Sequence, residues 1–368
     1  MSVNDLKLKL RNNVLRPTAM EVFKLFPGLA ASFRARKELD SIRREADKFF
    51  AEGSPLPEGA TREDYYQAME KHSVSISEYL HQYEFYKLSE SEREEFISRA
   101  QMRSLAFKLK SMYPEDTNGL TRFKNEFLKH FTELGFVKRR WLFGPECTYE
   151  QFTDLLSSTD CIIKPNDGSL GFGVKKVPRQ TDPLKVRELY DRCVKFKMIL
   201  EECVHNSSEI QAFHPSSLNT IRFVTIAFRG RAMAFGAFLR MGVGDMIIDN
   251  AHAGGLFAQI NIETGVIESD GITTEGLRVP RHPDTGIQIK GTPINRWDEI
   301  VGFCLSAARQ TNNIISGWDV IVTDKGVIEF IEVNNRPDFD VMQSPLKIGV
   351  KRKVFATLKE VIGKDITI

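Results

Sequence analysis

The chain of 368 residues is 42% hydrophobic and 27% charged, with a formal net charge of +2. These values predict an ordinary globular protein of about two or three domains, and they give no bulk attraction to nucleic acid, so no nucleic-acid partner is expected. The five cysteines are odd in number and form no C-x-x-C pair, which favours reduced thiols in a cytoplasm over disulfides or zinc.

Residues 1–118 predict an N-terminal α-helical domain without visible chemistry. The chain starts without the apolar stretch of a secretion signal and contains no apolar run of about 18 residues, so neither secretion nor a membrane span is expected. Basic residues at helical spacing within 1–50 predict a solvated helix face, with contact to an anionic membrane surface as the alternative. Thr61 with Asp64 predicts a helix start, and Ser89 begins a further helix expected to run to about Met112.

A helix is expected from Thr121 to Leu134 because Gly135 can end it, and the basic run 138–140 after it is expected at the surface. Residues 161–163 predict a strand that ends at Lys164-Pro165 and leads into the glycine-rich loop 167–173. Glycine lets backbone N–H groups approach a polyphosphate closely, and Lys164 adds a positive charge beside them. For this loop taken alone, an ordinary hairpin turn is the alternative.

Two predicted strands, 219–226 and 232–239, are joined by a turn at Arg229-Gly230 and bring two arginines into apolar surroundings. A buried guanidinium needs an anion, so Arg222 and Arg240 predict contacts to phosphate or to a substrate carboxylate. Structural ion pairs with nearby acids are the alternative. Helices are expected at 184–197 and 296–310, whereas the polar loop 280–286 has no assigned role.

Residues 317–340 predict two strands joined by a turn at 324–326. Asp319 lies on the first strand, and Glu332 and Asn334 lie two residues apart on the second, so the latter two share a face. Two carboxylates and an amide carbonyl form an oxygen cage suited to Mg²⁺, which usually binds together with nucleotide phosphates. A hairpin with an acidic exposed face is the alternative.

Together these motifs resemble the ATP-grasp superfamily: Lys164 with its loop, residues 201–204, and the hairpin with Asp319, Glu332 and Asn334. The segments FHPSSLNTIRFVTI, DNAHAGG, PRHPDTG and EVNNRPDFD are similar to its sugar-transfer-associated branch. The resemblance covers about residues 120–345. It implies an α+β ATP-grasp domain over residues 119–368, in which two α+β subdomains clamp ATP, with a lid at about 150–205.

The resemblance also implies the roles of individual residues. Glu201 would accept from the adenine amino group, the backbone at Cys203 and Val204 would pair with the ring edge, and Glu209 would hold the ribose. The positions implied for phosphate contact are Lys124, Lys164, Ser169, Gly171 and Gly173. Asn250 would line the reaction centre, where His252 is either a base for the incoming amine or a structural residue. Several ligases carry an arginine two residues before the first metal ligand, where this chain has Gly317, so Arg336 or Arg222 is expected to supply that charge.

The implied activity is an ADP-forming carboxylate–amine ligase that uses ATP and Mg²⁺, with Mn²⁺ as a substitute, and proceeds through an acyl phosphate. The resemblance implies a small-molecule acid and amine, with an amino acid or small amine joined to a sugar or polysaccharide precursor. The alternatives are a kinase acting on a sugar or polyol hydroxyl, a free-standing peptide ligase, and a catalytically silent partner of glycosyltransferases. A cytoplasmic location is expected, with peripheral contact at the inner membrane face through the basic N-terminal helix.

Overall fold

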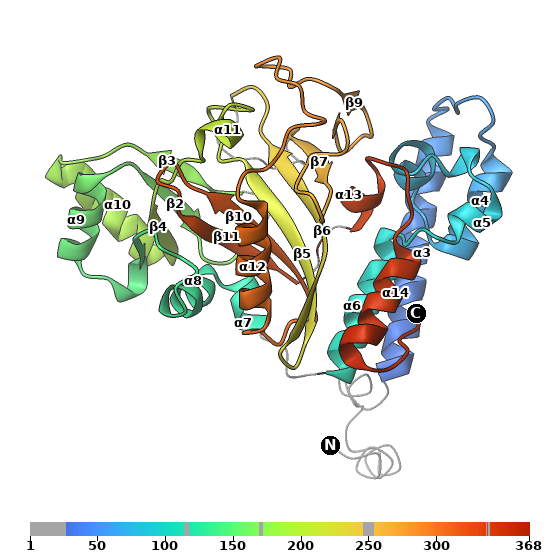
Figure 1. Cartoon of the computed structure of the whole chain (residues 1–368), viewed down its shortest axis with the longest axis horizontal. Helices are drawn as coiled ribbons and strands as arrows, with labels where there is room; N and C mark the ends of the chain where they lie inside the picture. The colour runs from blue at the N-terminus through green and yellow to red at the C-terminus, as the bar shows by residue number, and fades with distance from the viewer. Residues whose placement is uncertain (1–26, 114–117, 169–171, 246–253, 336, 338) are drawn as a thin grey trace, which may run out of the picture.

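The computed structural model describes residues 27–113, 118–168, 172–245, 254–335, 337 and 339–368 (Figure 1). Within these ranges no helix is both long enough and apolar enough to cross a bilayer. The chain builds two antiparallel sheets with helices packed against them, together with a group of helices from the N-terminal segment.

A seven-stranded sheet with the order β11-β10-β5-β6-β7-β8-β9 forms the centre. Its strands are β5 (Thr220–Phe228), β6 (Arg231–Met241), β7 (Leu256–Ile260), β8 (Gly271–Ile272), β9 (Arg278–Val279), β10 (Ile315–Val322) and β11 (Ile328–Asn334). The two hairpins predicted from the sequence, β5–β6 and β10–β11, are confirmed. Positive φ angles of 48° at Arg229 and 81° at Gly230 provide the tight β5–β6 turn.

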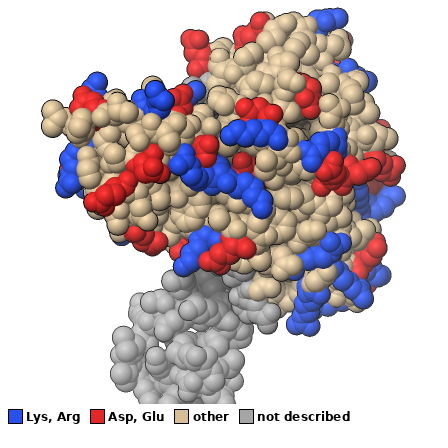
Figure 2. Space-filling view, turned by 60° about the vertical axis from the view of Figure 1, so that its left-hand side comes forward, with Lys and Arg blue, Asp and Glu red and all other residues tan. Residues whose placement is uncertain are grey.

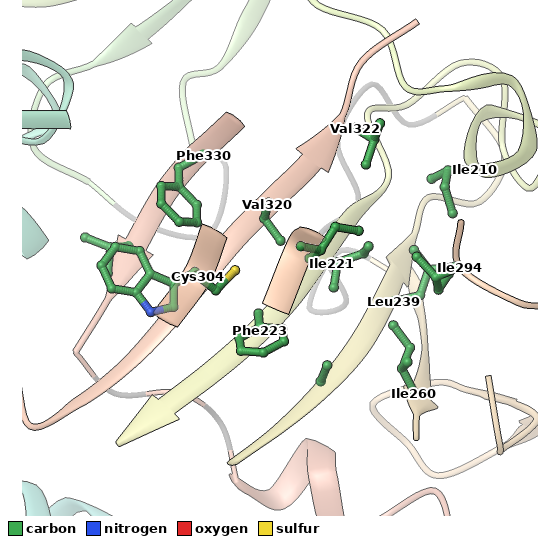
Figure 3. Close-up of a cluster of buried hydrophobic side chains, with 14 of the residues drawn as sticks. Ile210, Ile221, Phe223, Leu239, Ile260, Ile294, Cys304, Val320, Val322 and Phe330 are labelled. Atoms are coloured by element: carbon green, nitrogen blue, oxygen red, sulfur yellow. The ribbon is translucent and has the colours of Figure 1, made fainter. Parts of the chain in front are cut away.

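One face of this central sheet packs against α12 (Trp297–Ala308) and α8 (Lys124–Glu133). Figure 3 shows Phe223, Val320 and Phe330 from three strands meeting Cys304 of α12 in this cluster. Successive side chains of a strand point to opposite faces, so the residues of β10 that alternate with Val320 face the other way. Asp319 is one of them.

The other face of the central sheet is covered over part of its area by α6 (Arg99–Met112), α13 (Phe339–Gln343) and α14 (Lys351–Ile362). Leu105 of α6 and Leu358 of α14 share one buried cluster with Val224 of β5. Figure 1 shows these helices on the opposite side of the sheet from α12. Helix α6 of the N-terminal segment and the central sheet therefore share a core, and the division at residue 118 stays a prediction.

A four-stranded sheet, here called the lid sheet, has the order β1-β4-β2-β3. Its elements are β1 (Trp141–Phe143), β2 (Cys161–Pro165), β3 (Lys175–Val177) and β4 (Met198–Glu202), with α9 (Tyr149–Ser158) and α10 (Pro183–Lys195). Ile163 and Leu200 pack in the cluster that joins the lid sheet to these two helices. Lys164 and Glu201 alternate with them along the strands and project from the other face. Figure 2 shows basic and acidic side chains interspersed over the side of the molecule that carries the lid.

The N-terminal helices pack around their own aromatic cluster. They are α3 (Pro27–Ala51), α4 (Arg62–His72), the π-helix η1 (Glu78–Gln82), the 3-10 helix η2 (Phe85–Lys87) and α5 (Glu90–Arg93). Thr61 caps α4 by accepting from the N–H of Asp64, which confirms the predicted start. The shorter elements that connect the sheets are α7 (Asn118–Arg122), η3 (Gly144–Glu146) and α11 (Ser208–Gln211).

The single helix predicted from Ser89 to Met112 is wrong, because α5 ends at Arg93 and α6 begins at Arg99. Between them, the backbone N–H and C=O of Ile97 both bond to the buried side-chain amide of Gln343. These peptide groups are paired with α13 rather than within a helix, so the break is a docking point for the C-terminal segment.

The packing of the C-terminal segment against the break between α5 and α6 can be tested at Gly349, which lies against Glu95. A Cβ at Gly349 would overlap the backbone of Glu95, so Gly349→Ala should lower the free energy of unfolding by about 1–3 kcal/mol. Gly302 of α12 is exposed and has nothing within 4 Å of the corresponding Cβ position, so Gly302→Ala should raise it by about 0.5–1 kcal/mol. Urea unfolding of both variants measures the difference, and equal effects would contradict the described packing.

Candidate functional site

The three predicted metal ligands lie together at the β10–β11 edge of the central sheet. Asp319 is opposite Glu332 in the strand register, and the Asn334 Nδ2 donates to Glu332 Oε1 at 3.1 Å. Asp319 is buried, whereas Glu332 and Asn334 are half-buried. Among the described residues, no group of three or more His, Cys, Asp or Glu side chains is placed to hold a metal. The set is instead two carboxylates and one amide, which are hard oxygen donors that fit Mg²⁺.

Arg222 and Arg240 both contact Asp319. Arg222 donates to both Asp319 oxygens through Nε and Nη2, and the Nη1 of Arg240 donates to Oδ2 at 2.9 Å. Burial raises the pKa of the Asp319 carboxyl, but the two guanidinium groups outweigh it and hold this pKa below its ordinary value. Both arginines therefore form structural ion pairs, which is the alternative stated for them above. Their shared partner is Asp319, one of the predicted metal ligands.

Gly317 explains why the arginine beside Asp319 comes from β5. A Cβ at Gly317 would lie 3.0 Å from the Cδ of Arg222 and 3.1 Å from the Cβ of Pro337. The Arg222 side chain thus fills the space that a side chain at position 317 would need. Of the two candidates expected to supply this charge, Arg222 is in place at Asp319, and Arg336 lies outside the described residues.

Lys164 and Glu201 meet on the face of the lid sheet that is not covered by α9 and α10. The Lys164 Nζ lies 2.5 Å from Glu201 Oε1, and both side chains are buried. Burial raises the pKa of Glu201, but Arg139 and Lys164 outweigh it, so the pKa lies below its ordinary value and the carboxylate is ionised.

The expected surface position of Arg139 is wrong. Its side chain is only 1% exposed; its Nε donates to Glu201 Oε2 at 3.0 Å and its Nη1 donates to Glu329 Oε2 at 3.0 Å. Arg139 can be buried because two acids distant in sequence neutralise its charge. Nothing in the local run Lys138-Arg139-Arg140 distinguishes Arg139 from its two neighbours. The only sequence clue is Glu329, an acidic residue between the apolar residues Ile328 and Phe330 of β11.

Lys124 connects the start of α8 to the glycine-rich loop. Its Nζ donates to the carbonyl of Gly168 at 2.8 Å, and its backbone N–H donates to the carbonyl of Asn166 at 3.0 Å. Burial lowers the pKa of Lys124 below its ordinary value. The Glu332 carboxylate opposes this shift, and the Lys164 ammonium adds to it. The charges of Lys164 in the lid sheet and of the predicted metal ligand Glu332 therefore both act on Lys124.

The predicted adenine-contacting segment follows β4. The Cys203 N–H donates to the Asp160 carbonyl at 2.9 Å, so this N–H is already used. Within the described part of the chain, the Cys203 carbonyl and the Val204 N–H have no backbone partner, and both can pair with a ring edge.

The other residues predicted to contact the nucleotide are placed as follows. Glu209, expected to hold the ribose, accepts from Asn295 Nδ2 at 3.2 Å. Gly173 has φ 75° and lies against Pro165. Ser169, Gly171, Asn250 and His252 lie outside the described residues.

The loop 280–286, which the sequence leaves without a role, anchors the backbone after β6. His282 Nε2 bonds the Gly242 carbonyl at 2.8 Å, and Asp284 accepts from the Gly244 N–H at 2.7 Å. His214 Nε2 bonds the Gly244 carbonyl at 2.8 Å. Two sequence motifs that lie about 70 residues apart therefore fix one turn of the chain beside Arg240.

The model of the sugar-transfer-associated ATP-grasp family matches residues 141–359. No curated protein matches. Similar solved structures include the ATP-grasp ligase PsnB with a minimal precursor, at 13% identity, TM-score 0.40, and coverage of 67% of this chain and 62% of that chain. An L-amino acid ligase from Bacillus licheniformis gives 10% identity, TM-score 0.40, and coverage of 72% and 58%. This chain thus spans less than two thirds of the length of either protein.

The Asp319 cluster predicts a specific stability change. Asp319→Asn removes the charge that compensates the buried Arg222 and the half-buried Arg240, so the free energy of unfolding should fall by about 3 kcal/mol. Asp324→Asn, in the exposed β10–β11 turn, should change it by less than about 0.5 kcal/mol. Urea unfolding at neutral pH measures both, and a D319N variant as stable as D324N would contradict the buried ion pair.

Proposed function

The chain belongs to the sugar-transfer-associated ATP-grasp family, and on this premise we propose that it is an ADP-forming ligase that joins a carboxylate to an amine. The observation that carries the proposal is that charged side chains of the two sheets lie together. Lys164 of the lid sheet pairs with Glu201, which Arg139 links to Glu329 of the central sheet. Lys124, at the start of α8, donates to the Gly168 carbonyl in the loop that follows β2. A nucleotide with its metal ion requires this combination of charges.

In the proposed complex, ATP lies between the two sheets. Lys164 and Lys124 contact its phosphates, together with the loop that contains Ser169, Gly171 and Gly173. Glu201 accepts from the adenine amino group, the Cys203 carbonyl and Val204 N–H pair with the ring edge, and Glu209 turns to the ribose. Asp319, Glu332 and Asn334 would hold Mg²⁺, or Mn²⁺ in its place, which offsets phosphate charge when bound.

The proposed reaction has two steps. A carboxylate oxygen of the acid attacks the γ-phosphorus of ATP, the bond from this phosphorus to the β,γ-bridging oxygen breaks, ADP leaves with that oxygen, and an acyl phosphate is formed. The amine then attacks the acyl carbon, phosphate leaves with the bonding electron pair, and the amine nitrogen loses a proton. Lys164 and Lys124 stabilise the charge on the transferring phosphoryl group, while Arg222 and Arg240 orient Asp319. Asn250, His252 and Arg336 are proposed to line the reaction centre.

The proposed substrates are a sugar acid or amino sugar of a polysaccharide precursor and an amino acid or small amine. The sugar-transfer association of the family supports a saccharide as one partner. Arg222 and Arg240 place positive charge beside the metal-ligand set, which suits an anionic substrate. A cytoplasmic site of action, and contact of the basic N-terminal segment with a membrane surface, stay predictions.

Product analysis tests the reaction. With a panel of uronic acids, amino sugars and amino acids, ADP and phosphate should form in equal amounts, and only when an acid and an amine are both present. Lys164→Met and Glu332→Gln should each lower the rate by about 10²–10³-fold, the range for a lost electrostatic stabiliser. Lys175→Met, an exposed lysine of the lid strand β3, serves as the control and should leave the rate unchanged. AMP and pyrophosphate, or a stable phosphorylated product without an amine, would contradict the proposal.

A further inference from the structure

Arg139 is the one residue of the basic run 138–140 that joins the two sheets. Through Glu201 it contacts β4 of the lid sheet, and through Glu329 it contacts β11 of the central sheet. Its Nη1 also donates to the Phe330 carbonyl at 2.7 Å, and its Nη2 donates to the Ile331 carbonyl at 3.4 Å. The planar guanidinium thus binds both sheets at once, a geometry that a lysine ammonium cannot reproduce.

The charges around Arg139 balance. Arg139 and Lys164 are the cations, Glu201 and Glu329 are the anions, and all four side chains are at most 7% exposed. Removing ions from water is costly unless each keeps an opposite charge, so these four groups depend on one another. Glu201 divides its oxygens between the two cations, with Oε1 on Lys164 and Oε2 on Arg139.

This division matters when a nucleotide binds. In the proposed function Lys164 turns its charge toward the phosphates, which weakens its hold on Glu201. Arg139 then remains as the cation that keeps Glu201 ionised and fixed in orientation. A fixed carboxylate accepts a hydrogen bond from the amino group of adenine and repels the carbonyl oxygen that hypoxanthine carries at the same ring position.

We propose that Arg139 is a positioning residue that holds Glu201 at the purine edge and thereby sets a preference for ATP over ITP. The inference rests on the proposed function, because it requires ATP to bind between the two sheets. Arg140 provides the contrast. Its side chain is 49% exposed, and it reaches Asp154 and Glu202 on the outside of the lid, so it cannot act on Glu201 in this way.

The test compares two variants with the wild type. The double variant Arg139→Met/Glu329→Gln removes one cation and one anion, so the buried cluster stays neutral. The amide oxygen that E329Q introduces can still accept from the N–H groups of Lys138 and Arg139, as Glu329 does now. Arg140→Gln is the matched control. Thermal unfolding followed by circular dichroism checks that both variants are folded, and calorimetry with Mg²⁺ gives the dissociation constants for ATP and ITP.

Wild type and R140Q should prefer ATP over ITP by the same factor. In R139M/E329Q this preference should fall by about tenfold or more, because a charge-assisted hydrogen bond is lost while binding through the phosphates persists. An unchanged preference in the double variant, or no preference in the wild type, overturns the role of Arg139 and leaves the ligase proposal standing. Failure of the wild type to bind either nucleotide overturns both.

Discussion

The two sheets are held in relation to one another by a buried arginine that must satisfy acids on both. An unpaired guanidinium in this position would cost several kcal/mol, so any placement of the lid sheet must keep the contacts of Arg139 to Glu201 and Glu329. The same constraint places Lys164 beside Glu201. The orientation of the lid sheet and the charges on the face that carries Lys164 and Glu201 therefore depend on one balanced cluster.

Strand alternation explains how the central sheet carries both a core and a polar site. On β10, Trp318 and Val320 enter the apolar cluster under α12, and Asp319 between them points to the opposite face. That face is apolar where α6, α13 and α14 cover it and polar where Arg222 and Arg240 surround Asp319. Helix α6 of the N-terminal segment thus helps α13 and α14 to close the apolar part of this face, which gives it a structural role in the same core.

Features encoded within a few consecutive residues were predictable from the sequence. The hairpin with Asp319 and Glu332 follows from β-branched runs around a glycine turn. Its exact register does not follow from the sequence. Val320 lies opposite Phe330, so a regular ladder would place Ile331 opposite Asp319, and a β-bulge between Asp319 and Val320 brings Glu332 there instead. Features that depend on distant partners were not predictable. The burial of Arg139 requires two acids from strands about 60 and 190 residues away, and the break between α5 and α6 requires the amide of Gln343. Local propensity cannot report such partners.

If one nucleotide contacts both sheets, as proposed, hydrogen–deuterium exchange with and without Mg²⁺ and ADP should show it. Exchange should slow at 161–168 and 199–204 in the lid and at 328–335 in the central sheet, all at the same ADP concentration. Exchange in the exposed helix α10 should not change. Protection confined to one sheet, or absent from both at saturating ADP, would show that no nucleotide binds between them.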